Sequence, residues 1–336
     1  MIRTRILGTG HYLPERIVTN DELSKLMDTS DEWIRQRTGI EERRFVDFEN
    51  DPMGASELGT RAAREALDNA GISKDDVDLI IYATLSPDKF FPGDGVLVQA
   101  KLDIAPGVPA LDIRNQCSGF LYGLSVANAF IKTKTYKNIL LVGSEVHSTG
   151  LDLSDRGRDV SVIFGDGAAA VVLSGVEDDG DDDILSVHLH ADGRHADVLQ
   201  IAYPSSAEMP RATPEKIEEG LHWPMMEGRT VFKHASVRMP EVVMEALTQN
   251  GVTPEDIDLL IPHQANLRIS EMVQKRLKLR DDQVFNNIQK YGNTTACSIP
   301  LALHEAITEG KLKRGDLLCL AAFGAGFTWG SALIRY

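Results

Sequence analysis

Cysteine is scarce in this sequence, with three among 336 residues, and basic side chains are outnumbered, with 35 lysines and arginines against 50 aspartates and glutamates. Three scattered cysteines exclude a disulfide framework, and none has the C-x-x-C spacing of a metal site. The formal net charge of -15 argues against a nucleic-acid binder, because such a protein needs a basic surface. Nowhere do about 18 apolar residues follow one another, as a membrane span requires. We therefore expect a globular protein of the reducing cytoplasm.

The chain does contain an internal repeat. Residues 63–81 (AREALDNAGISKDDVDLII) align with residues 243–261 (VMEALTQNGVTPEDIDLLI). Each copy has helical apolar periodicity, a glycine at which the helix should stop, an acidic turn and a β-branched strand. The segments that follow, VPALDIRNQ and QVFNNIQKYGN, both predict a strand that leads into a helix and a further strand. The repeat predicts an α/β protein of two duplicated halves, residues 1–175 and 176–336, whose equivalent elements pair about a pseudo-twofold axis.

Two segments lie outside the repeat. Residues 177–183 (EDDGDDD) predict a solvated acidic turn. Residues 203–230 are rich in proline and glycine but also contain Trp223, Met225 and Met226. A long insertion with apolar residues predicts a lid or a binding loop, and the alternative is a loop that merely packs on its own domain.

Cys117 is the best candidate for a nucleophile. DIRNQ resembles the end of a strand and SGFLYGLSVANAF a helix, so the thiol should lie at the turn between them. Unpaired N–H groups and the partial positive charge of a helix N-terminus favour a thiolate and can also hold an oxyanion. Cys297 lies in a helical run and Cys319 in an apolar strand, where cysteine is usually a small buried hydrophobe.

His263 and Asn293 are candidates because of their places in the repeat. His263 follows the strand DIDLLI, where the chain leaves the carboxyl edge of a sheet, and such edges carry ligand groups in open α/β proteins. Asn293 lies in the turn of the second half that corresponds to the Cys117 turn of the first. Taken singly, His263 could be a polar loop residue and Asn293 a helix N-cap. Together with Cys117 they predict one polar site.

Competing motifs are weaker. His188 and His190 lie on one strand face and could bind a metal, but no third ligand has a suitable spacing, so we expect no metal site. The glycine-rich stretches match neither the dinucleotide nor the P-loop pattern, and no serine lies in G-x-S-x-G.

Nearly the whole chain resembles the β-ketoacyl-(acyl-carrier-protein) synthases III, condensing enzymes of the thiolase fold. The blocks that carry the resemblance are GTGHYLPE, TSDEWIRQRTGIEERR (29–44), CSGFLYGLSVA (117–127), DRG with IFGDGAAA (155–170), LHADG (189–193), PHQANLRI (262–269), GNTTACSIPLALHEA (292–306) and FGAGFTWGSALIRY (323–336). The resemblance implies two thiolase-like halves in a layered αβαβα arrangement. It also implies a catalytic set of cysteine, histidine and asparagine, which falls on Cys117, His263 and Asn293.

The family's chemistry suits these residues. Cys117 would take an acyl group from acyl-CoA, and malonyl-(acyl carrier protein) would then lose CO₂ and attack the acyl-enzyme, with no cofactor. His263 and Asn293 would donate hydrogen bonds to the enolate, while the backbone N–H groups of Cys117 and Ala325 would hold the second oxyanion. The resemblance therefore implies a fatty-acid condensing enzyme.

The resemblance also assigns binding residues. Trp33, Arg37 and Arg156 match groups that contact or sandwich the CoA adenine, which suits an indole and a flat guanidinium. Lys233 and Arg268 match basic residues that receive the carrier protein or the CoA phosphates. Between Arg268 and Arg280 the chain is rich in basic side chains, so an anionic carrier should dock beside His263 despite the negative net charge.

Phe91 matches a phenylalanine that reaches into the acyl pocket of the partner in a homodimer. The chain departs from the family at Asn115 and Gln116, where small apolar residues are usual, and at Ala325, where glycine is usual. Because the 203–230 insertion is long and carries flexible apolar residues, we expect a primer longer or less usual than acetyl-CoA.

Two other functions remain open. An acyltransferase of the same fold could load Cys117 and pass the acyl group on without decarboxylation, or could use longer acyl-CoA or an acceptor not carried by acyl carrier protein. A catalytically silent scaffold would be expected to have lost Cys117, His263 or Asn293, and the sequence retains all three.

Overall fold

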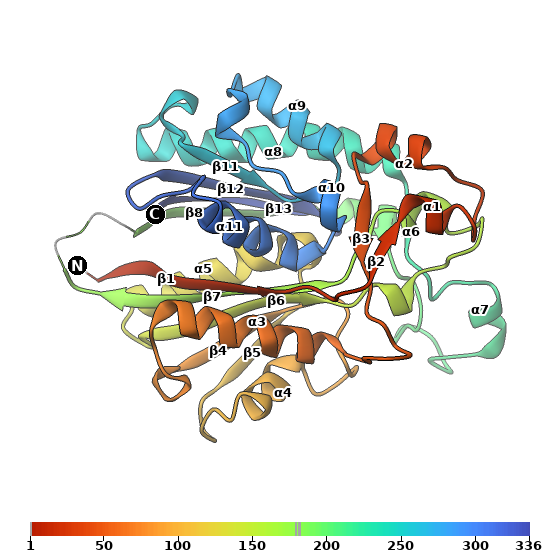
Figure 1. Ribbon diagram of the computed structural model, residues 1–336, viewed down its shortest axis with the longest axis horizontal. Helices are drawn as coiled ribbons and strands as arrows, with labels where there is room; N and C mark the ends of the chain where they lie inside the picture. The colour runs from red at the N-terminus through yellow and green to blue at the C-terminus, as the bar shows by residue number, and fades with distance from the viewer. Residues whose placement is uncertain (1, 179, 181–182) are drawn as a thin grey trace.

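Two β-sheets lie face to face with helices between them and on both outer sides (Figure 1). The structure is a computed structural model, and it describes residues 2–178, 180 and 183–336. The layers run helix, sheet, helix, sheet, helix, which confirms the predicted αβαβα arrangement of the thiolase fold. Of the acidic segment 177–183, residues 179, 181 and 182 lie outside the described residues, and the described Asp178 pairs with Arg3 and Arg5.

The first sheet has five strands in the order β1-β7-β6-β4-β5. Its strands are β1 (Arg3–Tyr12), β4 (Leu79–Ala83), β5 (Ala110–Ile113), β6 (Asn138–Glu145) and β7 (Gly167–Val176). β4 runs parallel to both β5 and β6, whereas β7 runs antiparallel to β6 and β1. Every residue of β4 is buried, as expected for a continuous apolar strand covered on both faces.

The second sheet repeats this topology with four strands in the order β11-β12-β13-β8. Its strands are β8 (Asp183–Ala191), β11 (Leu259–Pro262), β12 (Leu317–Gly324) and β13 (Thr328–Arg335). A fifth strand, predicted in QVFNNIQKYGN, is reduced to a single bridge between Leu260 and Val284. The ladder ends there because the side-chain oxygen of Gln264 accepts the N–H groups of Asn287 and Ile288.

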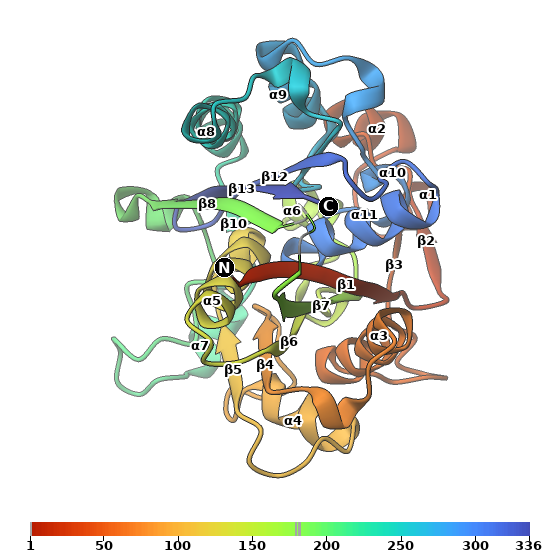
Figure 2. The ribbon, with the colours of Figure 1, turned by 90° about the vertical axis from the view of Figure 1, so that its left-hand side faces the viewer.

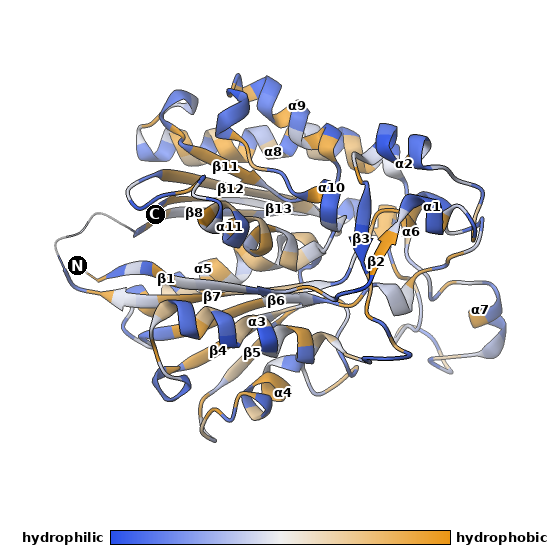
Figure 3. Ribbon diagram, in the orientation of Figure 1, coloured by the Kyte–Doolittle hydropathy of each residue, from blue (hydrophilic) through white to orange (hydrophobic). Residues whose placement is uncertain are grey.

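Six longer helices complete the layers, as Figure 2 shows from the side. Helices α5 (Gly119–Lys132) and α11 (Ser298–Thr308) lie between the sheets and share one apolar core with both. The outer face of the first sheet is covered by α3 (Ala55–Ala70) and α4 (Asp94–Lys101), and that of the second by α8 (Gly228–Asn250) and α9 (Leu267–Leu277). In Figure 3 the sheets are largely apolar, whereas the outer helices alternate between apolar and polar residues.

The repeated helices end where the sequence predicts. Gly71 and Gly251 follow α3 and α8 in the left-handed conformation, with φ of +66° and +67°, and their N–H groups bond to carbonyls of the last turn. The residues after each cap form the short acidic turns Lys74–Asp76 and Pro254–Asp256, which lead into β4 and β11.

Short elements surround one end of the two sheets. They are β2 (Ile17–Thr19), α1 (Asn20–Leu23), α2 (Asp31–Thr38), β3 (Glu42–Arg44), α6 (Arg158–Ser161), β9 (Leu199–Gln200), α7 (Pro214–Glu218), β10 (Met225–Met226) and α10 (Ile288–Tyr291). The insertion 203–230 contains α7, the β10 strand that pairs with β9, and the start of α8. In Figure 1 its α7 segment projects beside the carboxyl ends of the first sheet.

Candidate active site

Cys117 lies in a single 3₁₀ turn, Gln116–Ser118, that joins the end of β5 to the first residue of α5. The side chain is buried at 7 % exposure, which places the thiol at the inner end of the strand-to-helix turn, as predicted. Cys297 and Cys319 are fully buried, in agreement with their expected roles as small hydrophobes. Cys297 also lies at a helix N-terminus, as the N-cap of α11, so what distinguishes Cys117 is that its turn lines a cavity.

The surroundings of Cys117 favour the thiol, in opposition to the helix N-terminus, which favours the thiolate. Burial, together with the negative charge of Glu145, raises the pKa of Cys117 to about 12. Hydrogen bonds from the backbone N–H groups of Ala325 and of Cys117 itself act in the opposite direction but are outweighed. The same two N–H groups converge on the sulfur, where the resemblance places an oxyanion hole.

His263 follows the last residue of β11, and its N–H donates to the carbonyl of Ala321 at 2.7 Å. Its Nδ1 lies 2.5 Å from the Oγ atom of Ser298, at the start of α11. That oxygen also accepts the N–H of Gln264 at 3.4 Å, so the Ser298 proton is free to be donated to Nδ1. This arrangement favours the tautomer with the proton on Nε2.

The Nε2 atom of His263 is buried and has no partner among the described residues. Burial lowers the pKa of His263 to about 3, so the imidazole is neutral at physiological pH. A buried donor without a partner is costly in a resting protein. It is the arrangement expected for a group that donates to substrate.

Asn293 lies between α10 and the 3₁₀ turn Thr295–Cys297 that leads into α11. Its Oδ1 accepts the N–H of Thr295 at 2.8 Å, and its backbone is fixed by Ile163 and Gly165. This contact is an Asx-type turn, and the N-caps are Thr294 and Cys297, so the alternative interpretation of Asn293 as a helix N-cap is wrong. Because no described residue accepts from Nδ2, the amide N–H₂ remains available to a ligand.

The two turns are equivalent, and the structure adds the residue register between them, which the sequence did not specify. Cys117 lies two residues before the first residue of α5, and Ala296 lies two residues before the first residue of α11. The counterpart of Cys117 in the second half is therefore Ala296 and not Asn293. Each is preceded by a residue with positive φ, +43° at Gln116 and +41° at Thr295. The halves thus share a backbone geometry that is rare for residues other than glycine.

A buried hydrogen-bond network, not predicted from the sequence, lies behind Thr295. The Thr295 hydroxyl donates to Glu145 at 2.5 Å, and Nε2 of His147 lies 3.2 Å from the same hydroxyl. Glu145 also accepts from the hydroxyl groups of Thr84 and Ser86. Burial lowers the pKa of His147 to about 3. In the sequence this network could have been found only from Glu145 and His147, and the spacing of these two residues matches no motif.

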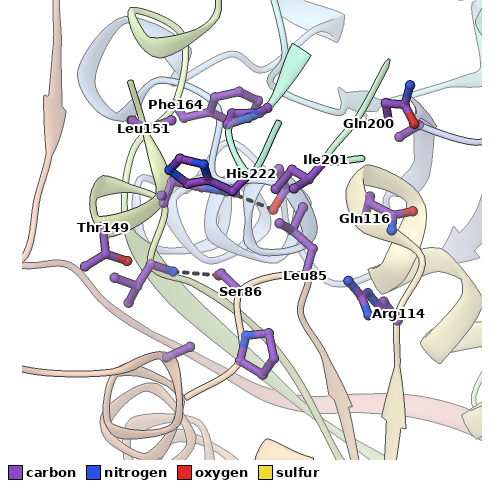
Figure 4. Close-up of a pocket in the computed structure, with 18 of the residues that line it drawn as sticks. Leu85, Ser86, Arg114, Gln116, Thr149, Leu151, Phe164, Gln200, Ile201 and His222 are labelled. Atoms are coloured by element: carbon purple, nitrogen blue, oxygen red, sulfur yellow. Dashed lines mark hydrogen bonds between the residues drawn. The ribbon is translucent and has the colours of Figure 1, made fainter. Parts of the chain in front are cut away.

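Cys117 opens into a cavity of about 780 Å³, a size typical of small-molecule sites. Ala325 and Gly326 line it beside Cys117, and Thr295 comes from the equivalent turn. His263 and Asn293 do not line it. Figure 4 shows its polar and apolar wall, which includes Leu85, Ser86, Arg114, Gln116, Thr149, Leu151, Phe164, Gln200, Ile201 and His222.

The insertion does contribute to this cavity, through Tyr203, Pro204, His222 and Pro224. The three apolar residues that the sequence singled out do not line it. Trp223 instead stacks on His222, with ring centroids 4.2 Å apart, and Met226 packs into the apolar cluster around α2. Met225 is 44 % exposed. The insertion therefore lines the cavity, but not through Trp223, Met225 or Met226, the side chains that the sequence singled out.

The residues assigned to CoA surround Trp33 on α2 and lie outside the cavity. The Arg37 guanidinium lies 4.5 Å from the centroid of the Trp33 ring. The second cation over this ring is Arg158, at 5.2 Å, and not Arg156. Arg156, expected on the other side of the adenine, forms an ion pair with Asp152 at 2.5 Å. The structure therefore adds Arg158 to the predicted set.

Lys233 and Arg268 meet at the outer helices of the second sheet. Lys233 is on α8, and Arg268, at the start of α9, lies 5.5 Å from the ring centroid of Phe232. The end of α9 adds Lys275 and Arg276. This basic region consists of Lys233 and the basic residues from Arg268 to Arg280, and Arg268 is five residues after His263 in the chain.

Phe91 is 81 % exposed, whereas its neighbour Phe90 lines the cavity and carries the Arg211 guanidinium 4.0 Å from its ring centroid. Both phenylalanines lie between β4 and α4, at the side of the molecule that ends in β5. β5 is an edge strand with no neighbour on one side among the described residues, and its Leu111 is 38 % exposed.

One group of described residues could bind a metal ion, and it lies apart from Cys117. The ligand atoms of His11, Glu65 and His304 all fall within 4.8 Å of one another, and the two imidazoles stack at 4.4 Å. His188 and His190, which the sequence raised as weak candidates, both face the Glu245 carboxylate, at 3.3 and 2.7 Å.

Comparisons with known proteins agree with this geometry. The sequence model of 3-oxoacyl-[acyl-carrier-protein (ACP)] synthase III matches residues 111–193, and that of its C-terminal part matches residues 247–336. The chain is 46 % identical to the β-ketoacyl-[acyl-carrier-protein] synthase III of Caldanaerobacter subterraneus subsp. tengcongensis, covering 100 % of this chain and 98 % of that protein. It is 47 % identical to the enzyme of the same name from Xanthomonas campestris pv. campestris, covering 100 % and 99 %.

Among solved structures, the crystal structure of 3-oxoacyl-[acyl-carrier-protein] synthase III from Aquifex aeolicus VF5 superposes with a TM-score of 0.89 at 46 % identity. The match covers 99 % of this chain and 100 % of that chain. No helix in the described part of the chain is long and apolar enough to cross a membrane.

Proposed function

The chain belongs to the β-ketoacyl-[acyl-carrier-protein] synthase III family and is a condensing acyltransferase of fatty-acid synthesis, and we propose that Cys117, His263 and Asn293 perform its chemistry. The observation that carries the proposal is the buried Nε2 of His263, which has no partner among the described residues, together with Nδ2 of Asn293, for which the described residues offer no acceptor. These donors suit an oxyanion that develops only when substrate reacts.

In the first half-reaction Cys117 attacks the thioester carbon of acyl-CoA. The C–S bond to CoA breaks, a new C–S bond to Cys117 forms, and the thiol proton passes to the departing CoA sulfur. The N–H groups of Ala325 and Cys117, which already point at the sulfur, hold the negative oxygen of the tetrahedral intermediate. Because the surroundings of Cys117 favour the thiol, the proton must leave as the bond forms.

In the second half-reaction the malonyl thioester loses CO₂, and the electron pair of the broken C–C bond becomes an enolate. His263 and Asn293 donate to its oxygen. The enolate carbon then attacks the acyl-enzyme, the bond to Cys117 sulfur breaks, and the sulfur regains a proton. Losing one such donor costs about 3 kcal/mol of transition-state stabilisation. Thiol, imidazole, amide and backbone suffice for every step, so we propose that no cofactor takes part.

We also propose the sites of the substrates. Trp33, Arg37, Arg156 and Arg158 suit the adenine end of acyl-CoA, since stacked guanidinium groups bind a purine face well. Lys233 and the basic end of α9 suit an acidic carrier protein. The enzyme is proposed to act in the cytoplasm.

A homodimer is proposed from the exposed side of the first half. An unpaired edge strand with an exposed leucine and an 81 % exposed Phe91 is a costly surface for a monomer. A second copy pairing there would place Phe91 beside the partner's cavity and complete the acyl site.

Two measurements test the function. Intact-mass spectrometry after addition of acetyl-CoA should detect one acyl group on the wild type and on Cys319→Ala, and none on Cys117→Ala. Release of CO₂ from malonyl-(acyl carrier protein) should depend on a loaded Cys117. Acylation without CO₂ release would favour the acyltransferase alternative. Acylation of Cys117→Ala would show that Cys117 is not the nucleophile.

A further inference from the structure

Arg114 is a cation without a counter-ion in the wall of the cavity that Cys117 opens into. It follows the last residue of β5 and comes three residues before the nucleophile. Its side chain lines the cavity, yet no described residue forms an ion pair or a hydrogen bond with it. A guanidinium presents several N–H donors in a fixed fork, and that fork matches a carboxylate.

The nearby acids do not neutralise Arg114. Asp88, the other charged group of the wall, accepts the N–H and the hydroxyl of Ser56. Asp112, two residues before Arg114 on the strand, accepts the N–H groups of Asp94 and Gly95 at 2.7 and 3.1 Å. Both carboxylates are therefore occupied by helix N-termini, and neither forms an ion pair with Arg114, which is a solvent-exposed residue at the cavity wall.

Further hydrogen-bonding groups share this chamber. Figure 4 shows Gln116 beside Arg114, with Leu85 and Ile201 lying between them and His222 in this view. The Nδ1 atom of His222 is buried and has no partner among the described residues. The wall mixes apolar residues such as Leu85 and Ile201 with polar ones such as Ser86 and Gln200, and Arg114 is its one guanidinium among the described residues. Such a wall suits a ligand with a polar end.

The CoA phosphates are a poor explanation for this cation. The residues that suit CoA and the carrier protein, Trp33, Arg37, Arg156, Lys233 and Arg268, all lie outside the cavity. The chamber that holds Arg114 is therefore the space left for the acyl group once its thioester reaches Cys117.

We propose that Arg114 selects acyl-CoA primers whose acyl chain ends in a carboxylate, that is, CoA thioesters of dicarboxylic acids. The proposal rests on the proposed function of Cys117 and names the substrate class of the same site. The distal carboxylate pairs with Arg114 while the thioester carbon reaches the sulfur, and it takes no part in bond making or breaking.

A competition experiment tests this. The enzyme is given equimolar succinyl-CoA and butyryl-CoA, then glutaryl-CoA and valeryl-CoA, and the two adducts are compared by intact-mass spectrometry at short times. Each pair has the same number of acyl carbons and differs in the terminal carboxylate. A charge-assisted hydrogen-bonded pair is worth about 1.5–3 kcal/mol, so the diacid adduct should be favoured by about tenfold or more in the wild type.

Arg114→Gln should abolish this preference, and Arg114→Lys should keep part of it. Arg64→Gln is the matched control, because Arg64 is on α3, bonds to the Lys101 carbonyl and does not line the cavity. It should keep the wild-type ratio. If Arg114→Gln folds poorly, Arg114→Lys supplies the test through its reduced ratio.

Three results would overturn the inference. They are a wild type that prefers the neutral acyl chains, a ratio that does not change in Arg114→Gln, and a variant whose only defect is loss of dimer in light scattering, which would make Arg114 an interface residue. Failure of the proposed function would look different, since no thioester, including acetyl-CoA, would then acylate Cys117.

Discussion

Gly324 lies so close to Cys117 that a Cβ atom at position 324 would be 2.5 Å from the Cβ of Cys117 and 3.0 Å from its sulfur. Gly324 is the last residue of β12, and it directly precedes Ala325, whose N–H points at the sulfur. The strand end and the nucleophile turn are thus in van der Waals contact, and no side chain fits between them.

Gly324→Ala should therefore slow acylation of Cys117 by about a hundredfold, because moving the thiol by roughly 1 Å is enough to misalign the attack. Acylation is followed by intact mass, and stability by thermal unfolding. Gly193→Ala is the control, since nothing lies within 4 Å of a Cβ there. Wild-type acylation by Gly324→Ala would show that the turn adjusts without cost.

The reactivity of Cys117 should rise with pH over an unusually wide range. Since its pKa is raised to about 12, the thiolate fraction grows by about tenfold per pH unit through the neutral and alkaline range. Alkylation of Cys117 by iodoacetamide, followed by peptide mapping, should therefore accelerate from pH 7 to pH 10 without levelling off. A plateau below pH 9 would mean that a positive group or the helix end lowers the pKa more than burial raises it.

His263→Ala and Asn293→Ala should separate the two half-reactions. Each removes a donor to the enolate, so decarboxylative condensation should fall by about a hundredfold or more, whereas loading of Cys117 from acyl-CoA should change far less. His190→Ala, on the exposed side of β8, is the control for loss of an imidazole. Equal losses in both half-reactions would place the altered group at the nucleophile instead.

Stability should fall as the medium becomes acidic between about pH 6.5 and pH 3. In the unfolded chain His147 and His263 bind protons below their ordinary pKa of 6.5, whereas in the fold burial keeps both neutral down to about pH 3. The unfolded state then holds more protons, so the free energy of unfolding decreases as the pH falls through this window.

His147→Gln should flatten that decrease, measured by urea unfolding at several pH values. His190→Gln, at a partly exposed imidazole, should keep the wild-type slope. Parallel slopes for His147→Gln and the wild type would show that His147 is protonated in the folded state.

Arg268→Glu should raise the KM for malonyl-(acyl carrier protein) several-fold, because it reverses a charge at the start of α9 beside the proposed docking surface. Loading from acyl-CoA should be spared, and the effect should shrink at high salt. Lys311→Glu, beyond the far end of α11, is the control for the change in net charge. Loss of both activities together would assign Arg268 to CoA binding.

Much of the fold could be predicted because its signals are local. The helix stops at Gly71 and Gly251 are properties of a few neighbouring residues, and the apolar strands that follow them are continuous in the chain. The turns that hold Cys117, His263 and Asn293 were found in the same way, as points where an apolar strand or a helix begins or ends.

The parts that were missed depend on contacts between distant residues. Gln264 ends the fifth strand through its side chain, and Arg158, from a distant part of the chain, lies over the Trp33 ring. The raised pKa of Cys117 likewise depends on burial and on Glu145, a residue of another strand. No pattern in the neighbouring sequence records these contacts.

The strained backbone at Gln116 and Thr295 bears on how the two halves of the chain arose. The two turns have the same unusual backbone, and their following residues, Cys117 and Ala296, occupy equivalent places on either side of the axis. In a dimer of a single ancestral half, two identical strand-to-helix turns would have faced one another. After duplication within one gene the two turns could differ in sequence. One could then specialise in nucleophilic attack and the other in stabilising negative charge.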